Sequence, residues 1–158
     1  MAKTVIGIDP GLAGTGIGLV TGCGLKVHSY SFGSIVTPKT DSLSVRLDLI
    51  YTRIRDILSS HKPDLMVIED VFSLERYPKS GILLGKVSGV ILLSAAHAGI
   101  AAVEIPVRES KKILSGNGNA DKDQLEQAVR RYLKHGEPIR PFHASDALAL
   151  ALIGLFRQ

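Results

Sequence analysis

The chain has 158 residues, a length that predicts one compact domain, 1–158, with enough chain to bury a core. Its 45% hydrophobic content excludes a disordered protein, and its single cysteine excludes a disulfide framework or a zinc site built from cysteines. The net charge of +4 is uneven, because residues 1–75 carry 7 basic and 8 acidic side chains and residues 76–158 carry 12 and 7. This split suits an acidic centre facing a basic surface for a polyanion, and scattered solubilising charge would give it equally well.

The start of the sequence lacks the features of a secretory signal, since Met1 to Thr4 lead directly into an apolar, strand-like segment. No uninterrupted apolar run reaches the roughly 18–20 residues that a membrane span needs. We therefore expect a cytoplasmic protein that does not contact membranes.

Strands are predicted in the first part of the chain, at residues 5–9, 16–20 and 26–35, and glycine-rich turns join them as hairpins. Residues 43–58 have apolar side chains at spacings of three and four, which predicts an amphipathic helix. Residues 65–68 are apolar without alternation, which is typical of a strand covered on both faces.

Helices dominate the predictions for the remainder of the chain. Residues 82–98 are too long an apolar segment for one strand, and residues 102–105 are typical of another buried strand. Residues 121–133 predict an amphipathic helix that opens with a capping box, and residues 142–156 predict a helix that is apolar almost all round. Hairpin strands followed by alternating helices and strands indicate an α/β domain with a mixed sheet.

Three acids stand where a sequence that builds a core would not place them. Asp9 and Glu69 each end an apolar strand, and Asp146 lies inside the apolar final helix. A buried carboxylate without a partner costs several kcal/mol, so each needs a cation, hydrogen bonds or a metal. Asp9-Pro10-Gly11 is also an ordinary turn signal, but two acids at strand ends can share the carboxyl edge of a sheet, where α/β folds bind ligands.

His143 lies three residues before Asp146, which places both side chains on one face of a helix. Such a histidine is either a helix cap or, beside the acid, a ligand or general base. Carboxylate oxygens with at most one imidazole are suited to Mg²⁺ or Mn²⁺. Acids that bind divalent ions are what phosphodiester hydrolysis requires, because paired metals activate water and stabilise the leaving oxygen.

Four motifs together resemble the RuvC Holliday-junction resolvases, in family order and over nearly the whole chain. The motifs are IGIDPG from residue 6, VIEDVF from residue 67, GNGNADK from residue 116 and HASDALA from residue 143. The resemblance implies a ribonuclease-H-like fold, with a five-stranded mixed sheet and helices on both faces.

The resemblance also implies an active site with two Mg²⁺ or Mn²⁺ ions. Asp9 would bridge the ions, Glu69 and Asp146 would hold one each, and His143 would ligate the second ion or orient the water. Many members have aspartate where this chain has His143, so its imidazole reduces the negative charge that holds the second ion. Lys122 would approach the scissile phosphate, although a solvated lysine in a helix's first turn is an equally ordinary finding.

Further residues are predicted to contact DNA. Phe72 falls where the family has an aromatic that stacks or wedges at the junction, and an aromatic there could equally belong to the core. Candidates for phosphate contacts that position the duplex are Arg76, Lys79, Lys86, Lys111 and Lys112.

The function implied is paired symmetric nicking of a four-way DNA junction in recombination and repair. A homodimer would place two active sites on two strands, and the helix that contains Gly85 and Gly89 corresponds to the family's pairing element. These glycines would suit close packing on the sheet just as well. A branch-migration complex of the RuvA and RuvB type is the implied partner.

Other functions are compatible with parts of the pattern. An actin-like phosphotransferase also opens with a Gly-x-Asp-x-Gly strand, but it needs two such lobes, for which 158 residues leave no room. A nuclease-fold module that binds branched nucleic acid without cutting it, or an RNA-processing relative of the same fold, is the main alternative. The complete acidic set argues against an inactive module, since binding a polyanion gives no reason to keep buried negative charge.

Overall fold

The computed structural model describes residues 1–70 and 78–158. Five strands form one mixed sheet in the order β3-β2-β1-β4-β5. The first three strands pair antiparallel as two hairpins, and β4 and β5 continue the sheet parallel to β1. The strands are β1 (Lys3–Asp9), β2 (Gly14–Cys23), β3 (Lys26–Val36), β4 (Leu65–Glu69) and β5 (Ala101–Ile105).

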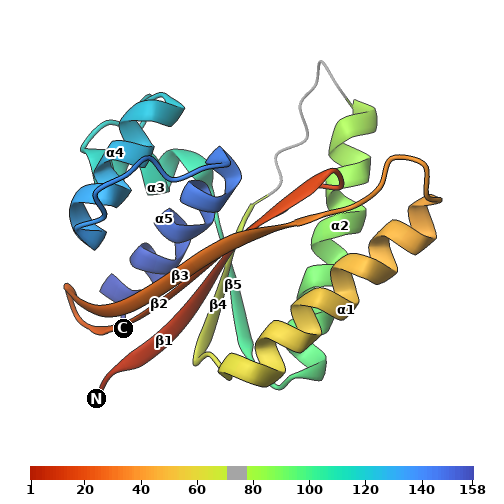
Figure 1. The fold of residues 1–158 in the computed structure, drawn as a ribbon, viewed down its shortest axis with the longest axis horizontal. Coiled ribbons are helices and arrows are strands. Elements are labelled where there is room, and N and C mark those ends of the chain that lie inside the picture. The colour runs from red at the N-terminus through yellow and green to blue at the C-terminus, as the bar shows by residue number, and fades with distance from the viewer. Residues whose placement is uncertain (71–77) are drawn as a thin grey trace.

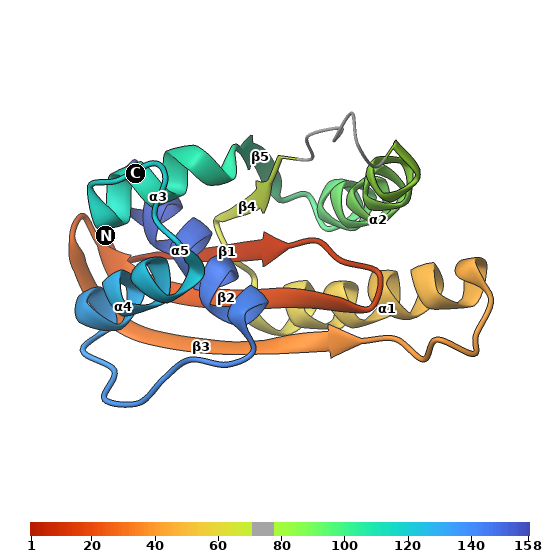
Figure 2. The same cartoon turned by 90° about the horizontal axis from the view of Figure 1, so that it is seen from above.

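Helices cover both faces of this sheet, which confirms the predicted architecture. Helices α1 and α2 lie on one face and α3, α4 and α5 on the other (Figures 1 and 2). The helices are α1 (Leu43–His61), α2 (Pro78–His97), α3 (Val107–Ser115), α4 (Lys122–Leu133) and α5 (Phe142–Phe156).

Alternation along the central strand supplies both halves of the core. In β1, Val5 belongs to the cluster that contains α5, whereas Ile6 and Ile8 pack with residues of α1 and α2. The prediction of a strand covered on both faces is confirmed for β4, whose central residues are fully buried. Helix α5 packs between the sheet and the outer helices, which explains why its sequence is apolar almost all round.

The start of α4 has the predicted capping box. The Asp121 carboxylate accepts a hydrogen bond from the Gln124 backbone N–H at 2.8 Å, and the Gln124 side chain accepts one from the Asp121 N–H at 2.9 Å. The box satisfies two of the amides that a helix start leaves unpaired. It fixes Lys122 as the first residue of α4.

In the second half of the chain, one expectation is wrong and one of two open alternatives is excluded. Strand β5 is not a buried strand, because it is the sheet's edge, and Val103 remains 43% exposed. Gly85 and Gly89 do not pack on the sheet, because a Cβ at either position would have no atom within 4 Å in the described structure. Both glycines lie on the outer side of α2.

Helix α2 also differs from the prediction that no segment is long enough to cross a membrane. By length and composition alone its 20 residues pass that test, although soluble proteins contain such helices as well. Its buried residues pack toward α1 and the sheet, and Ile82 and Leu93 are exposed on the outer side.

Candidate active site

The parallel pairing of two neighbouring strands brings the first two acids together. Ile8 of β1 is in register with Ile68 of β4, so the next residues, Asp9 and Glu69, end adjacent strands at the same edge. This is the carboxyl edge, at which the chain leaves each strand. The sequence prediction that both acids share this edge agrees with the strand pairing.

Glycines in β1 and β2 let helix α5 pack closely on the sheet, which brings the third acid, Asp146, to the same edge. The backbone of α5 packs so closely on β1 and β2 that a Cβ on Gly7 would lie 1.9 Å from the Ala147 carbonyl oxygen. A Cβ on Gly16 would lie 1.9 Å from the His143 carbonyl oxygen, a separation that real atoms never adopt. Only glycine therefore allows the first turn of α5, with His143 and Asp146, to reach the strand ends.

Hydrogen bonds from two buried threonines hold the turn that follows Asp9. The Thr15 hydroxyl donates to the Gly11 carbonyl at 2.8 Å, and the Thr37 hydroxyl donates to the Leu12 carbonyl. From α1, the Arg46 Nε–H donates to the Thr37 hydroxyl at 2.8 Å. The turn thus has a fixed position beside the candidate site.

Burial and the neighbouring carboxylates change the protonation of Asp9, at the end of β1. Burial, then a hydrogen bond with the Glu69 side chain and the nearby charges of Glu69 and Asp146, together raise the pKa of Asp9 to about 10, and the charge of Lys122 opposes this shift. Two ionised carboxylates cannot share a hydrogen bond, and the raised pKa of Asp9 means that Asp9 carries the proton in the metal-free site. A divalent cation would replace that proton.

The two side chains from α5 are also perturbed. Burial, and then the charge of Glu69, raises the pKa of Asp146 to about 6, whereas the charges of Lys122 and Lys111 oppose the shift. Burial, and then the charge of Lys122, lowers the pKa of His143, which favours the neutral imidazole with a free lone pair. Lys122 therefore lies within electrostatic reach of three of the candidate ligands.

The donor set fits a divalent metal ion. The three carboxyl groups are hard oxygen donors, and His143 Nε2 is buried and has no hydrogen-bond partner within the described structure. The backbone of Gly14 covers this nitrogen, because a Cβ there would lie 3.0 Å from it. Within residues 1–70 and 78–158, no three His, Cys, Asp or Glu side chains are placed to hold one ion together, so ligation requires rotation of these side chains.

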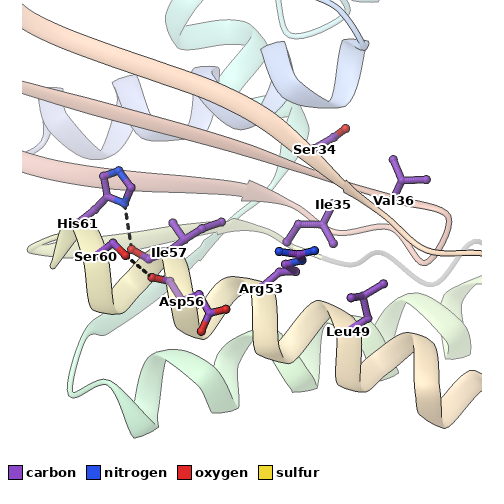
Figure 3. Close-up of a pocket in the computed structure, with 9 residues that line it drawn as sticks. All are labelled: Ser34, Ile35, Val36, Leu49, Arg53, Asp56, Ile57, Ser60 and His61. Carbon is purple, nitrogen blue, oxygen red and sulfur yellow. Dashed lines mark hydrogen bonds between the residues drawn. The ribbon is translucent and has the colours of Figure 1, made fainter.

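The candidate site is separate from a groove elsewhere on the molecule. That groove, about 510 Å³ in volume, lies between the exposed edge of β3 and α1 (Figure 3). Ile35 and Leu49 are apolar parts of its lining, and Arg53 points into it from α1. None of the predicted site residues lines it.

Comparison with known proteins identifies the family. A family model described as "Crossover junction endodeoxyribonuclease RuvC" matches residues 5–154. RuvC of Syntrophomonas wolfei is 38% identical over 96% of this chain and 87% of that protein, and RuvC of Rhodopirellula baltica is 35% identical over 97% and 86%. The structure of Thermus thermophilus RuvC "in complex with Holliday junction substrate" matches with a TM-score of 0.91 and 30% identity, covering 98% of this chain and 94% of that one.

The chain belongs to the RuvC family. Membership makes it a crossover junction endodeoxyribonuclease with a ribonuclease-H-like fold, and it implies dependence on a divalent metal. The likeness of the fold extends to the yeast mitochondrial Holliday junction resolvase, with a TM-score of 0.63 at 12% identity. The expected class of enzyme and fold are thus confirmed.

The residues predicted to contact DNA fall into three groups. Lys111, at the half-buried side of α3, is close enough to affect the titration of Asp146. Lys79, Lys86 and Lys112 are exposed, and no contact within the described structure connects them to the carboxyl groups. Phe72 and Arg76 lie outside the described residues.

The sequence reading missed the residues that position the RuvC site. Thr37 follows a strand and Arg46 lies in an amphipathic helix, where either would be an ordinary surface residue. Their role becomes visible only when the fold brings them to the turn after Asp9. The glycines of β2 did give a signal, since Gly14, Gly16 and Gly18 occupy every second position of a strand, where glycine is otherwise disfavoured.

Proposed function

We propose that this RuvC chain resolves four-way DNA junctions by paired symmetric nicks, with Asp9, Glu69, His143 and Asp146 as its metal-binding active site. The observation that carries the proposal is the meeting of two strand ends and the first turn of α5. There the Asp9 carboxyl shares a hydrogen bond with Glu69 and is affected by the charge of Asp146. Such a cluster of acids is costly unless cations occupy it.

These four side chains would hold Mg²⁺ or Mn²⁺, and we propose two ions. The bound ions would supply Lewis acidity to the attacking water and to the leaving oxygen of the phosphodiester. His143 contributes a neutral nitrogen, because burial and the charge of Lys122 both lower its pKa. It therefore adds a ligand or a water-orienting group without adding negative charge.

Lys122 would contact the phosphate that is cut. The capping box places it in the first turn of α4, and its charge affects Asp9, His143 and Asp146. Its Nζ lies 6.0 Å from the centre of the Phe142 ring, at the start of α5. A cation at this place favours the approach of a phosphate to an otherwise acidic centre. Lys111 would add a second positive charge beside Asp146.

A homodimer would supply the second active site that paired nicks require. The outer side of α2 supports this proposal, because Ile82 and Leu93 are exposed there and Gly85 and Gly89 leave room for a second helix. The single nuclease domain, the cytoplasmic location and the use of a RuvA- and RuvB-type branch-migration complex belong to the same proposal. The Thermus thermophilus relative supports the four-way junction as substrate.

A synthetic four-way junction tests the proposed activity. The protein is incubated with a junction of fixed sequence in Mg²⁺, in Mn²⁺ and in EDTA, and strand-specific labels report each cut. We expect nicks at symmetric positions on two opposed strands in the presence of either metal and none in EDTA. Binding without nicks under every metal condition would instead support a module that recognises branched nucleic acid without cutting it.

A further inference from the structure

We propose that the exposed face of α4 is a phosphate-binding track that holds one duplex arm of the junction away from the cleavage point. We define the α4 face as Gln124, Gln127, Arg131 and Lys134. This inference rests on the proposed function, because it takes the four-way junction as substrate.

The α4 face runs the full length of the helix. Its residues are spaced by three and four along the chain, and all four are exposed. Two of these side chains are amides that donate hydrogen bonds and two are cations, and the exposed Asp123, four residues before Gln127, borders the face at the first turn of the helix. Amides and cations are the donors that bind phosphate oxygens without reading sequence.

One end of this face lies at the candidate active site and the other lies far from it. Lys122, at the start of α4, is near Phe142 at the start of α5. At the other end, the Tyr132 ring packs on Phe156 at the end of α5, with ring centres 5.2 Å apart. The two helices therefore run in the same direction away from the site (Figures 1 and 2).

The far end is hollowed and strongly basic. A hollow of about 400 Å³ is lined by Gln127, Arg130, Arg131, Lys134 and His135. A second hollow, of about 470 Å³, shares Lys134 and adds Lys26 and His28 from the β2–β3 hairpin. Both hollows are lined without a single acidic side chain, which suits a polyanion better than a protein partner of mixed charge.

In the described part of the chain, some cations near α4 form ion pairs that stabilise the fold, and others are free to bind a ligand. Arg130 Nε lies 2.7 Å from the buried Glu126 carboxylate, which also accepts a hydrogen bond from the Ile139 backbone N–H. At the first turn, Asp123 is near Arg140, at 3.5 Å.

Arg131 and Lys134, in contrast, make no ion pair within the described structure. Glu137, in the loop after α4, is the exposed acid nearest in sequence to Lys134.

The dimensions of the track match those of a duplex. Lys134 lies twelve positions after Lys122, which corresponds to about 18 Å along a helix axis. A strand of B-form DNA has one phosphate per about 3.4 Å of axis, so this length spans about five base pairs. The α4 face would thus contact phosphates about three to six base pairs from the phosphate that is cut.

A thermodynamic cycle between protein charges and DNA phosphates tests the proposal. The double variant Arg131→Gln/Lys134→Gln is compared with the wild-type protein for binding to a four-way junction in EDTA, where no cleavage occurs. A matched control, Arg55→Gln/Lys62→Gln, removes two positive charges from a hollow at the ends of α1 and α2, on the other face of the sheet. Each protein is tested on a natural junction and on one with neutral methylphosphonates three to six base pairs from the cut.

We expect the α4 variant to bind the natural junction about eightfold more weakly per lost contact at 0.1 M salt. The slope of log affinity against log salt should fall by about 0.9 for each contact. Methylphosphonates should weaken the wild-type protein and the control by similar factors, and they should have little further effect on the α4 variant.

Two results would overturn the α4 track. One is unchanged affinity and salt slope in the α4 variant; if the melting temperature falls at the same time, these cations only stabilise the end of the helix. The other is an equal penalty from methylphosphonates in all three proteins. Failure of the wild-type protein to bind any junction would refute the proposed function itself, and cleavage in Mg²⁺ with no role for α4 would leave that function intact.

Discussion

Glycines serve opposite purposes in two regions of the molecule. In β1 and β2 they let the backbone of α5 pack directly on the strands, and a Cβ on Gly7 or Gly16 would overlap a carbonyl oxygen. In α2, Gly85 and Gly89 face open space. In the first region, the lack of side chains fixes the position of α5 on the sheet. In the second region, it leaves a surface that a partner can approach. The same residue type therefore indicates contact in one place and absence of contact in the other.

The largest effect on activity is expected from the carboxylates that the glycine-packed region holds at the candidate active site. Replacing Asp9 or Asp146 with Asn keeps the size of the side chain and removes a charge that holds the metal. We expect the cleavage rate to fall by about 1,000-fold or more, with junction binding retained. Rates on a synthetic junction and gel-shift affinities measure the two quantities. Full cleavage by either variant would refute the site.

Paired glycine substitutions contrast the two regions directly. Gly16→Ala forces the start of α5 away from β2 and should destabilise the fold by about 3 kcal/mol or more. Gly89→Ala makes the same chemical change in an open helix position and should stabilise the monomer by about 0.5–1 kcal/mol. Urea unfolding of both variants measures the free energies. Equal effects would show that the packing on α5 is not specific.

Acid–base behaviour in the packed region gives a third prediction. The pKa of Asp146 is raised to about 6 and that of Asp9 to about 10, so both shifts stabilise the metal-free protein below the ordinary carboxyl pKa of 3.8. This contribution is lost as pH rises, first through about 6 for Asp146 and then toward about 10 for Asp9.

In EDTA, we therefore expect the wild-type protein to lose stability between pH 4 and 8 relative to Asp146→Asn, which lacks one titrating group. Metal binding should strengthen over the same range, because ligands must release protons. Thermal melts across pH with EDTA or Mg²⁺ check both trends. A stability difference that does not vary with pH would contradict the burial of Asp146.

The smallest effect on the fold is expected in the open region. Leu93, 49% exposed on α2, can accept a charge with little loss, so Leu93→Asp should change monomer stability by less than about 0.5 kcal/mol. It should nevertheless weaken the proposed dimer, because a buried, unpaired charge at an interface is costly. Sedimentation over a range of concentrations measures the dimer. Leu25→Asp makes the same substitution at a position that is 75% exposed between β2 and β3, outside α2, and is the charge-matched control.

Most helices and strands could be predicted from the sequence, because the signals for them come from residues that are close together in the chain. The amphipathic periodicity of α1 and α4, the capping box and the apolar run of β4 each arise from neighbouring residues. Helix α3 was not predicted, since its nine residues make only about two and a half turns and include just three apolar side chains, Val107, Ile113 and Leu114. The exposure of β5 was misjudged because its composition resembles that of a central strand, and only the strand order shows that it is an edge.

The residues of the candidate site likewise fall into those that the sequence could identify and those that it could not. Asp9, Glu69 and Asp146 could be singled out because an acid in an apolar segment conflicts with its surroundings. Thr37 and Arg46 produce no such conflict, and the α4 face has cations at a helix end, where they are normally explained by the helix dipole. Residues whose role depends on where the fold places them, and not on unusual burial, can be recognised only from the three-dimensional structure.

Helix α5 has a consequence for how a chain of this kind can lose activity. Its first turn carries His143 and Asp146, and its remaining turns are buried almost completely between the sheet and α3 and α4. A substitution that displaces the helix damages the catalytic centre and the folded state together. Gradual decay through loosening of this region is therefore expected to be rare. A descendant that keeps only DNA binding would instead exchange the carboxylates one by one and leave the helix in place.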